Sequence, residues 1–113
     1  MEEELFLPPG MKPIIHNLAS ELVLNPGEEK VFPELKSRLL NANFRIKTDG
    51  KLILTLEENL DSNWVATDKT ACHEGVTLWQ CLLKKSTFRT RVKNPTDRKV
   101  QVTLDVLIPE IEG

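Results

Sequence analysis

The sequence predicts an all-β protein, an antiparallel β-sandwich or jelly-roll-like domain of about seven or eight short strands. Two observations lead to this prediction. Apolar and polar residues alternate with a period of two over much of the chain, which is typical of strands with one buried face. Turn-forming residues separate these runs at short intervals, and at most one short segment, near residues 33–40, has a helical pattern.

The segment 42–57 is predicted to form a β-hairpin that turns at Asp49-Gly50. A loop of residues 48–50 makes one face of this hairpin wholly apolar, whereas a two-residue loop would place leucines beside lysine and arginine. We therefore expect the three-residue loop, with Gly50 in the left-handed conformation that glycine tolerates. The expected pairs are Ala42 with Leu56, Phe44 with Leu54 and Ile46 with Leu52.

A second hairpin is predicted for residues 86–108, with its turn at residues 94–98. Both of its strands alternate apolar and polar residues, so one face should be buried in the core. The expected pairs are Val92 with Val100, Thr90 with Val102 and Phe88 with Leu104. The side chains expected to be buried are Phe88, Val92, Val100, Val102, Leu104 and Val106.

The region before the first hairpin is predicted to contain short strands and a turn. Residues 25–28 match a type II turn because proline and glycine occupy the two central positions. Residues 33–40 are the only helix candidate, with proline at the first helical position, and a strand at residues 37–40 is the alternative. The expected short strands are residues 13–16, 18–24 and 29–32.

The segment 75–84 is apolar on both faces, so it is predicted to be a strand that is covered on both sides. One cover is the core, and the other is the N-terminal arm or another subunit. The two faces are Val76, Leu78 and Leu82 on one side, and Trp79, Cys81 and Leu83 on the other.

Residues 1–12 are predicted to form an extended N-terminal arm, and residues 13–113 a single domain. Pro8 and Pro9 exclude a helix in the arm and favour polyproline geometry. The arm is too short to form a core, so we expect its apolar residues to bind another chain. The arm residues expected to bind a partner are Leu5, Phe6 and Leu7.

Composition excludes several classes of protein. The chain has 113 residues and a net charge of −2, so no overall positive field attracts nucleic acid or acidic lipid. No apolar run is long enough to span a bilayer, which predicts no membrane partner. The N-terminus is acidic and has no apolar run of the kind found in secretion signals, so we expect cytosolic synthesis without a signal peptide.

No residue pattern in the sequence indicates catalysis or a cofactor. Cys72, His73 and Cys81 do not have the paired spacing of a structural zinc site, so no metal is expected. We expect two free thiols, with a disulfide between Cys72 and Cys81 as the alternative. Phosphate-binding loops and nucleophile motifs are absent, and we therefore expect a protein that is not an enzyme.

A basic row is expected on one strand face of the second hairpin, within the cation-rich region 84–99. The row could track phosphate, form a solvated face, or contact a neighbour in an assembly. Nucleic acid is the weakest of these alternatives because no aromatic residues are interleaved with the cations. The row residues expected to bind a partner are Arg89, Arg91 and Lys93.

These features together predict a non-enzymatic structural subunit of a larger protein assembly. A virion component is expected, either a capsid decoration or cement protein or a tail component, that binds neighbouring subunits through its arm and sheet edges. Its partners would be copies of itself or capsid and tail proteins. The alternative is a stand-alone binding module that recognises a peptide, a glycan or nucleic acid through the region 84–99.

Overall fold

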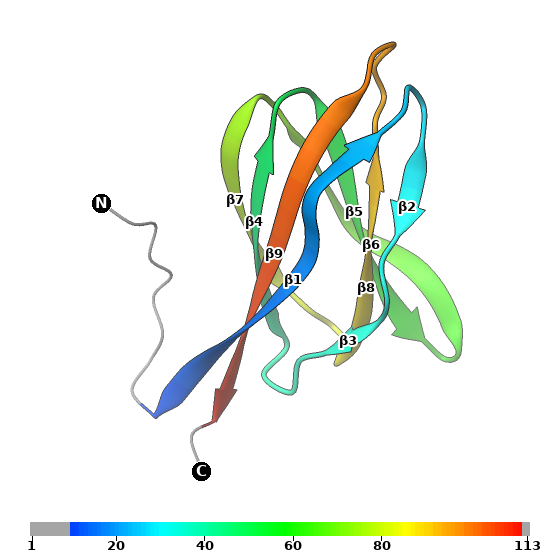
Figure 1. Cartoon of the computed structure of the whole chain (residues 1–113). Coiled ribbons are helices and arrows are strands. Elements are labelled where there is room, and N and C mark those ends of the chain that lie inside the picture. Colours follow the sequence, from blue (N-terminus) through cyan, green and yellow to red (C-terminus); the bar gives the residue numbers. More distant parts are fainter. Residues whose placement is uncertain (1–9, 112–113) are drawn as a thin grey trace.

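The computed structural model describes residues 10–111, which form two antiparallel sheets packed face to face (Figure 1). This arrangement confirms the predicted β-sandwich class. The first sheet has the order β1-β9-β4-β7, and the second has the order β2-β8-β5-β6, with β3 also paired to β8. The strands of the described residues are β1 (Met11–Leu24), β2 (Glu29–Val31), β3 (Leu35–Lys36), β4 (Asn41–Thr48), β5 (Leu52–Leu60), β6 (Asn63–Cys72), β7 (Gly75–Leu82), β8 (Thr87–Lys93) and β9 (Val100–Ile111).

The core lies between the two sheets and contains the apolar side chains that alternation placed on the buried faces of the two predicted hairpins. Phe44 of β4 meets Phe88 of β8 edge-to-face, with ring centroids 6.4 Å apart, so aromatic contact joins the two sheets. The expected burial is therefore confirmed. The buried residues of the two predicted hairpins are Ala42, Phe44, Ile46, Leu52, Leu54, Leu56, Phe88, Val92, Val100, Val102, Leu104 and Val106.

The predicted pairing within segment 42–57 is wrong, because β4 and β5 belong to different sheets. Ile46 lies opposite Leu104 and Thr77, and not opposite Leu52. The connection crosses between the layers because Asp49 bonds to β9. Its main-chain N–H donates to the Gln101 carbonyl at 3.2 Å, and its carboxylate accepts from the Gln101 N–H at 2.8 Å. Two apolar strands that face each other across a core show the same alternation as two paired strands.

Gly50 does not adopt the expected left-handed conformation; among the described glycines, positive φ occurs at Gly10, Gly27 and Gly75. Its role is steric. A Cβ at this position would lie 2.9 Å from a methyl of Val100, closer than real Cβ atoms approach. The neighbouring Thr48 hydroxyl donates to the Gly50 carbonyl at 2.9 Å and accepts from its N–H at 3.2 Å, which holds the backbone against β9.

The predicted pairing of the second hairpin is also wrong, since β8 and β9 lie in different sheets. Asn94, which is fully buried, fixes this crossing. Its side-chain amide donates to the carbonyls of Leu24, Asn25 and Arg98 at 3.1, 3.1 and 2.7 Å. The turn after β8 is therefore bonded to the turn after β1, and the chain passes from one layer to the other.

The predicted helix at residues 33–40 is absent, and the described residues contain no helix that could span a membrane. Leu35 and Lys36 form β3 instead, paired with β8. The alternative strand at residues 37–40 is wrong as well, because these residues form a turn with Leu40 at φ 55°. A helix of two turns has little stability of its own, so pairing with the open edge of β8 prevails.

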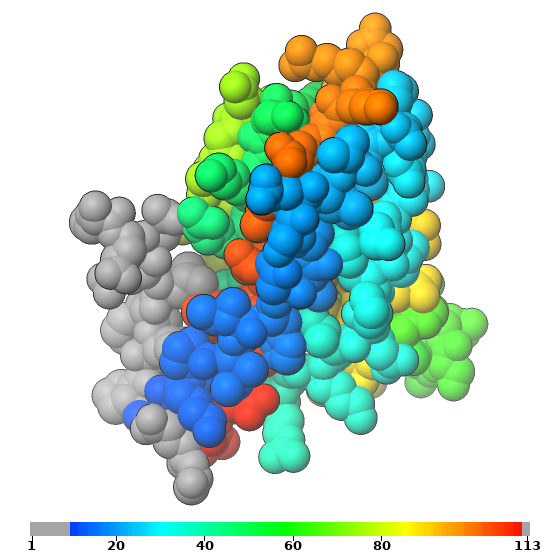
Figure 2. All heavy atoms as spheres, in the orientation of Figure 1, coloured from blue at the N-terminus to red at the C-terminus, as the bar shows by residue number. Residues whose placement is uncertain are grey.

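The predicted strands at residues 13–16 and 18–24 are one strand, β1, whose register against β9 shifts between Asn17 and Leu22. Figure 2 shows β1 (blue) lying along β9 (orange to red), with β2 and β3 (cyan) on its other side. The turn at residues 25–28 is confirmed: the Glu28 N–H donates to the Asn25 carbonyl at 3.0 Å, and Gly27 has φ 75°. The described chain enters the sheet at Met11.

Candidate functional site

The basic row of β8 lies on the outer face of the second sheet, where it meets a carboxylate of β5. Glu57 lies opposite Arg89 in the ladder. The Arg89 Nε donates to one oxygen of Glu57 at 2.6 Å, and the Arg91 Nε donates to the other at 3.2 Å. One acidic side chain therefore binds both arginines. Sequence reasoning missed Glu57 because only the pairing of β5 with β8 brings it to the row.

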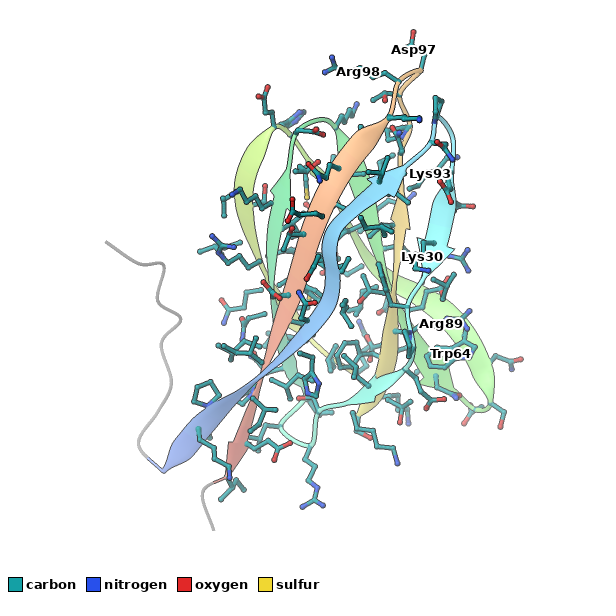
Figure 3. All side chains as sticks on the ribbon, viewed as in Figure 1. Lys30, Trp64, Arg89, Lys93, Asp97 and Arg98 are labelled. Atoms are coloured by element: carbon teal, nitrogen blue, oxygen red, sulfur yellow. The ribbon has the colours of Figure 1, made fainter. Side chains whose placement is uncertain are left out.

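The guanidinium of Arg89 also stacks over Trp64 of β6, 4.4 Å from the ring centroid, as Figure 3 shows. Two of the three predicted cations thus have partners within their own sheet, and their exposure is partial. Lys93 is exposed and lies toward the Arg98 end of the strand (Figure 3). The row is consequently a mixed-charge cluster, which is a poorer anion surface than three aligned free cations would be.

The environment of Glu57 has opposing effects on its pKa. Burial raises the pKa, but the hydrogen bonds and positive charges of Arg89 and Arg91 outweigh burial, so the pKa is lowered from its ordinary value of 4.5. The ionised form of Glu57 is therefore stabilised by folding, and the cluster contributes to stability when the carboxylate is charged.

Replacing Glu57 with glutamine is expected to lower the free energy of unfolding near neutral pH. The ionised carboxylate stabilises the fold above the ordinary pKa of 4.5, and this contribution is lost as the pH falls through the lowered folded-state pKa. The difference between the two proteins should accordingly shrink in acid. Urea denaturation between about pH 7 and pH 2 measures it, and a difference that is the same at both ends would contradict the ion-pair role.

The two cysteines are free and buried. Burial raises the pKa of Cys72. Burial and the negative charges of Asp68 and Glu58 raise the pKa of Cys81 to about 12. Both thiols therefore stay protonated at neutral pH and are poor nucleophiles and poor metal ligands. Within residues 10–111, no three His, Cys, Asp or Glu side chains gather into a metal-binding group.

A groove of about 490 Å³ crosses the outer face of the first sheet at its β4, β9 and β1 strands. Its charged side chains have both signs, and its lining contains no histidine, cysteine or serine. The lining residues are Glu21, Arg45, Lys47, Thr48, Asp49, Gln101 and Thr103.

The edge strand β7 differs from the other edges of the described sandwich. A sheet edge exposes unpaired backbone groups, and proteins usually protect it with charges, proline, bulges or short length. Strand β1 has an irregular register and contains Lys12 and Pro13. Strand β2 has only three residues, and β6 carries Asp68 and Lys69. Strand β7 has eight residues and regular pairing with β4, and contains no charge and no proline.

The outward face of β7 is exposed and, apart from Gln80, apolar. Val76, Leu78 and Leu82 are 47%, 45% and 78% accessible. The inward face is in the core: Cys81 is buried, and Trp79 packs on Phe44 with ring centroids 5.3 Å apart. The core cover that the sequence predicted for this strand is present, and no residue within 10–111 is described as covering its other face. An unprotected edge with an apolar face is a surface suited to pairing with another chain.

No protein-family model and no curated protein matches this chain. Its fold is similar to that of the PBSX exported protein XepA, with a TM-score of 0.70 and 19% sequence identity. The match covers 84% of this chain and 36% of XepA, so this chain spans little more than a third of the length of that protein. PirA is a second similar structure, with a TM-score of 0.50, 7% identity and coverage of 93% and 97% of the two chains. These likenesses establish the fold.

The structure describes only some of the partner-binding residues that the sequence predicted. Arg89, Arg91 and Lys93 share one strand face, as expected from their spacing. The arm residues, Leu5, Phe6 and Leu7, lie outside the described residues. The exposed apolar face of β7 was recognised as a two-sided strand, but its position at a sheet edge follows only from the topology.

Proposed function

We propose that this chain is a non-enzymatic structural subunit of a larger protein assembly, which it joins through the edge strand β7. The observation that supports this proposal is the unprotected, apolar edge described above. Leu78 and Leu82 expose a large part of their surface, and burying a leucine side chain is worth about 1.5–3 kcal/mol. Backbone pairing along the edge adds geometric specificity to this apolar contact.

A phage particle is the assembly that we infer, with the chain as a capsid decoration, cement or tail component. The fold likeness to XepA, named as an exported protein of the phage PBSX, supports this inference. The edge of β7 is exposed in the isolated chain. On a particle, a neighbouring subunit would cover it. The N-terminal arm is proposed as a further contact to neighbouring subunits.

The test compares two lysine substitutions on edge strands. Leu78→Lys places a charge on the exposed face of β7, and Val65→Lys places one at a residue of similar exposure, 40%, on β6. Tagged chains are expressed in the cells that carry the gene, and released particles are separated by density gradient. We expect the particle-bound fraction to fall about tenfold or more for Leu78→Lys and to stay unchanged for Val65→Lys.

Two outcomes would contradict the proposal. One is that the unmodified chain never sediments with particles, which would leave the stand-alone binding module as the better account. The other is that both lysine variants are retained equally, which would remove β7 from the contact. Circular dichroism of both variants establishes that the sandwich is folded.

A further inference from the structure

We propose that the partner of β7 is β7 of a second copy, paired antiparallel about a two-fold axis with Trp79 opposite Trp79. This inference rests on the proposed function in one respect, that β7 is a contact edge. The first sheets of the two copies would then continue into each other. Each β7 already pairs with β4 on one side, so the backbone groups on its other side are those that a second strand would bond.

The composition of β7 makes it compatible with itself. Residues Gly75–Leu82 contain no charged side chain, so antiparallel self-pairing places no like charges opposite each other. Charged residues follow only at the two ends. Glu74 directly precedes the strand, and Lys84 and Lys85 follow it; all three are exposed. An antiparallel arrangement brings the acidic end of one copy to the basic end of the other.

The positions of these charges select the register. With Trp79 on the two-fold axis, Glu74 of one copy, which directly precedes β7, comes near Lys84 of the other copy, which lies two residues beyond the end of β7, and symmetry repeats the contact. On the outward face, Val76 lies opposite Leu82 of the other copy. Shifting the axis to Leu78 would instead place Glu74 opposite Leu82 and lose both charge pairs. With Trp79 on the axis, Leu78 lies opposite Gln80, whose exposed side chain is polar. The register is therefore selected by the charges at the ends and by the apolar contact of Val76 with Leu82.

A pairing of Glu74 with Lys85 is excluded by the alternation of the strand. That register would place Val76, which faces outward, opposite Leu83, which is buried on the inward side. A shift of one residue exchanges the two faces of a strand, so the outward and core faces of the joined sheets would not match. The register with Trp79 opposite Trp79 keeps outward residues opposite outward residues throughout.

The first test is the molar mass of the purified chain across a concentration series, measured by analytical ultracentrifugation. The monomer mass is 12.9 kDa, and we expect a reversible dimer of twice this mass. Leu78→Lys should raise the dimer dissociation constant about tenfold or more, and Val65→Lys should leave it unchanged. A chain that stays monomeric at every concentration overturns the inference.

The second test exchanges the charges at the strand ends. Glu74→Lys and Lys84→Glu should each weaken the dimer about tenfold, because each creates two like-charge contacts. The double variant Glu74→Lys/Lys84→Glu should restore it. A mixture of the two single variants should form heterodimers, since lysine at 74 of one chain then meets glutamate at 84 of the other. Failure of both the double variant and the mixture to recover would overturn this register.

Cross-linking measures the register independently. The double variant Val76→Cys/Leu82→Cys should form a covalent dimer under mild oxidation, because the thiol at position 76 of one copy lies opposite the thiol at position 82 of the other. Either single variant should remain uncross-linked, and the native thiols are a low background because they are buried. Cross-linking of the single variants to the same extent would overturn the register.

The outcome of these experiments separates the inference from the proposed function. A chain that binds particles through β7 but stays monomeric in solution, with no cross-link of the double cysteine variant, keeps the proposed function and overturns the self-pairing. A chain that dimerises as described but never enters particles overturns the proposed function and keeps the self-pairing.

Discussion

Replacing Phe44 with alanine is expected to lower the free energy of unfolding by about 3–5 kcal/mol. The side chain is fully buried and touches both layers: it packs on Trp79 within its own sheet and on Phe88 across the core. Truncation removes apolar burial and two aromatic contacts, and leaves a cavity that facing strands held by regular ladders cannot close. Urea denaturation followed by circular dichroism measures the change.

Phe44→Leu is the matched control, because it retains most of the side-chain volume. We expect its cost to be clearly smaller than that of the alanine variant. A loss below about 1 kcal/mol for Phe44→Ala would contradict the assignment of Phe44 to the centre of the core, since core truncations of large aromatic residues cost several times more.

Replacing Glu58 with alanine is expected to lower the free energy of unfolding by about 3 kcal/mol, since it removes three partly buried hydrogen bonds to a charged acceptor, and each such bond contributes about 1.5–3 kcal/mol. Glu58 is 1% exposed. One of its carboxylate oxygens accepts the main-chain N–H groups of Lys84 and Lys85, both at 2.6 Å. The other oxygen accepts the Thr67 hydroxyl at 2.5 Å. One side chain thus fixes the connection between β7 and β8 to β5 and β6.

Glu58→Gln separates the hydrogen bonds from the charge. Its single side-chain oxygen can still accept both main-chain N–H groups, so we expect a smaller loss than for alanine. Amide hydrogen exchange at Lys84 and Lys85 gives a local measurement. Exchange at these two residues should accelerate strongly in the alanine variant and weakly in the glutamine variant. Equal acceleration in both would show that charge, and not hydrogen bonding, holds the connection.

The sequence predicted which residues are buried more accurately than which strands are partners. Alternation at Phe44 and Ile46 correctly indicated that these side chains face the core. Alternation alone cannot say whether Leu54 lies beside Phe44 in one sheet or opposite it across the core, because both arrangements bury the same residues. The deciding contacts are specific and distant: Asp49 bonds to Gln101, and Asn94 to Leu24.

The helix predicted for residues 33–40 was wrong for a different reason. Local preferences at Pro33 and Glu34 favour a helix start, but the open edge of β8 offers backbone partners that a two-turn helix cannot match. In the candidate site, too, local sequence patterns identified only part of the interacting residues. Arg89 and Arg91 were found from their spacing in one strand, whereas Glu57, their partner, comes from a strand far away in the sequence. Local sequence patterns do not show which strands pair in the folded protein.

The pairing of β1 with β9 has a consequence for how the chain folds. Among the described strands, β5 and β6 are the only pair of consecutive strands that share a ladder; the others find partners from remote parts of the chain. Such topologies close long loops before they gain contacts, and domains of this type fold in milliseconds to seconds. Strand β4 lacks its β9 neighbour until most of the chain has been synthesised. An edge as unprotected as β7 would then be available to other nascent chains before the sandwich is complete, which favours aggregation of partly folded chains.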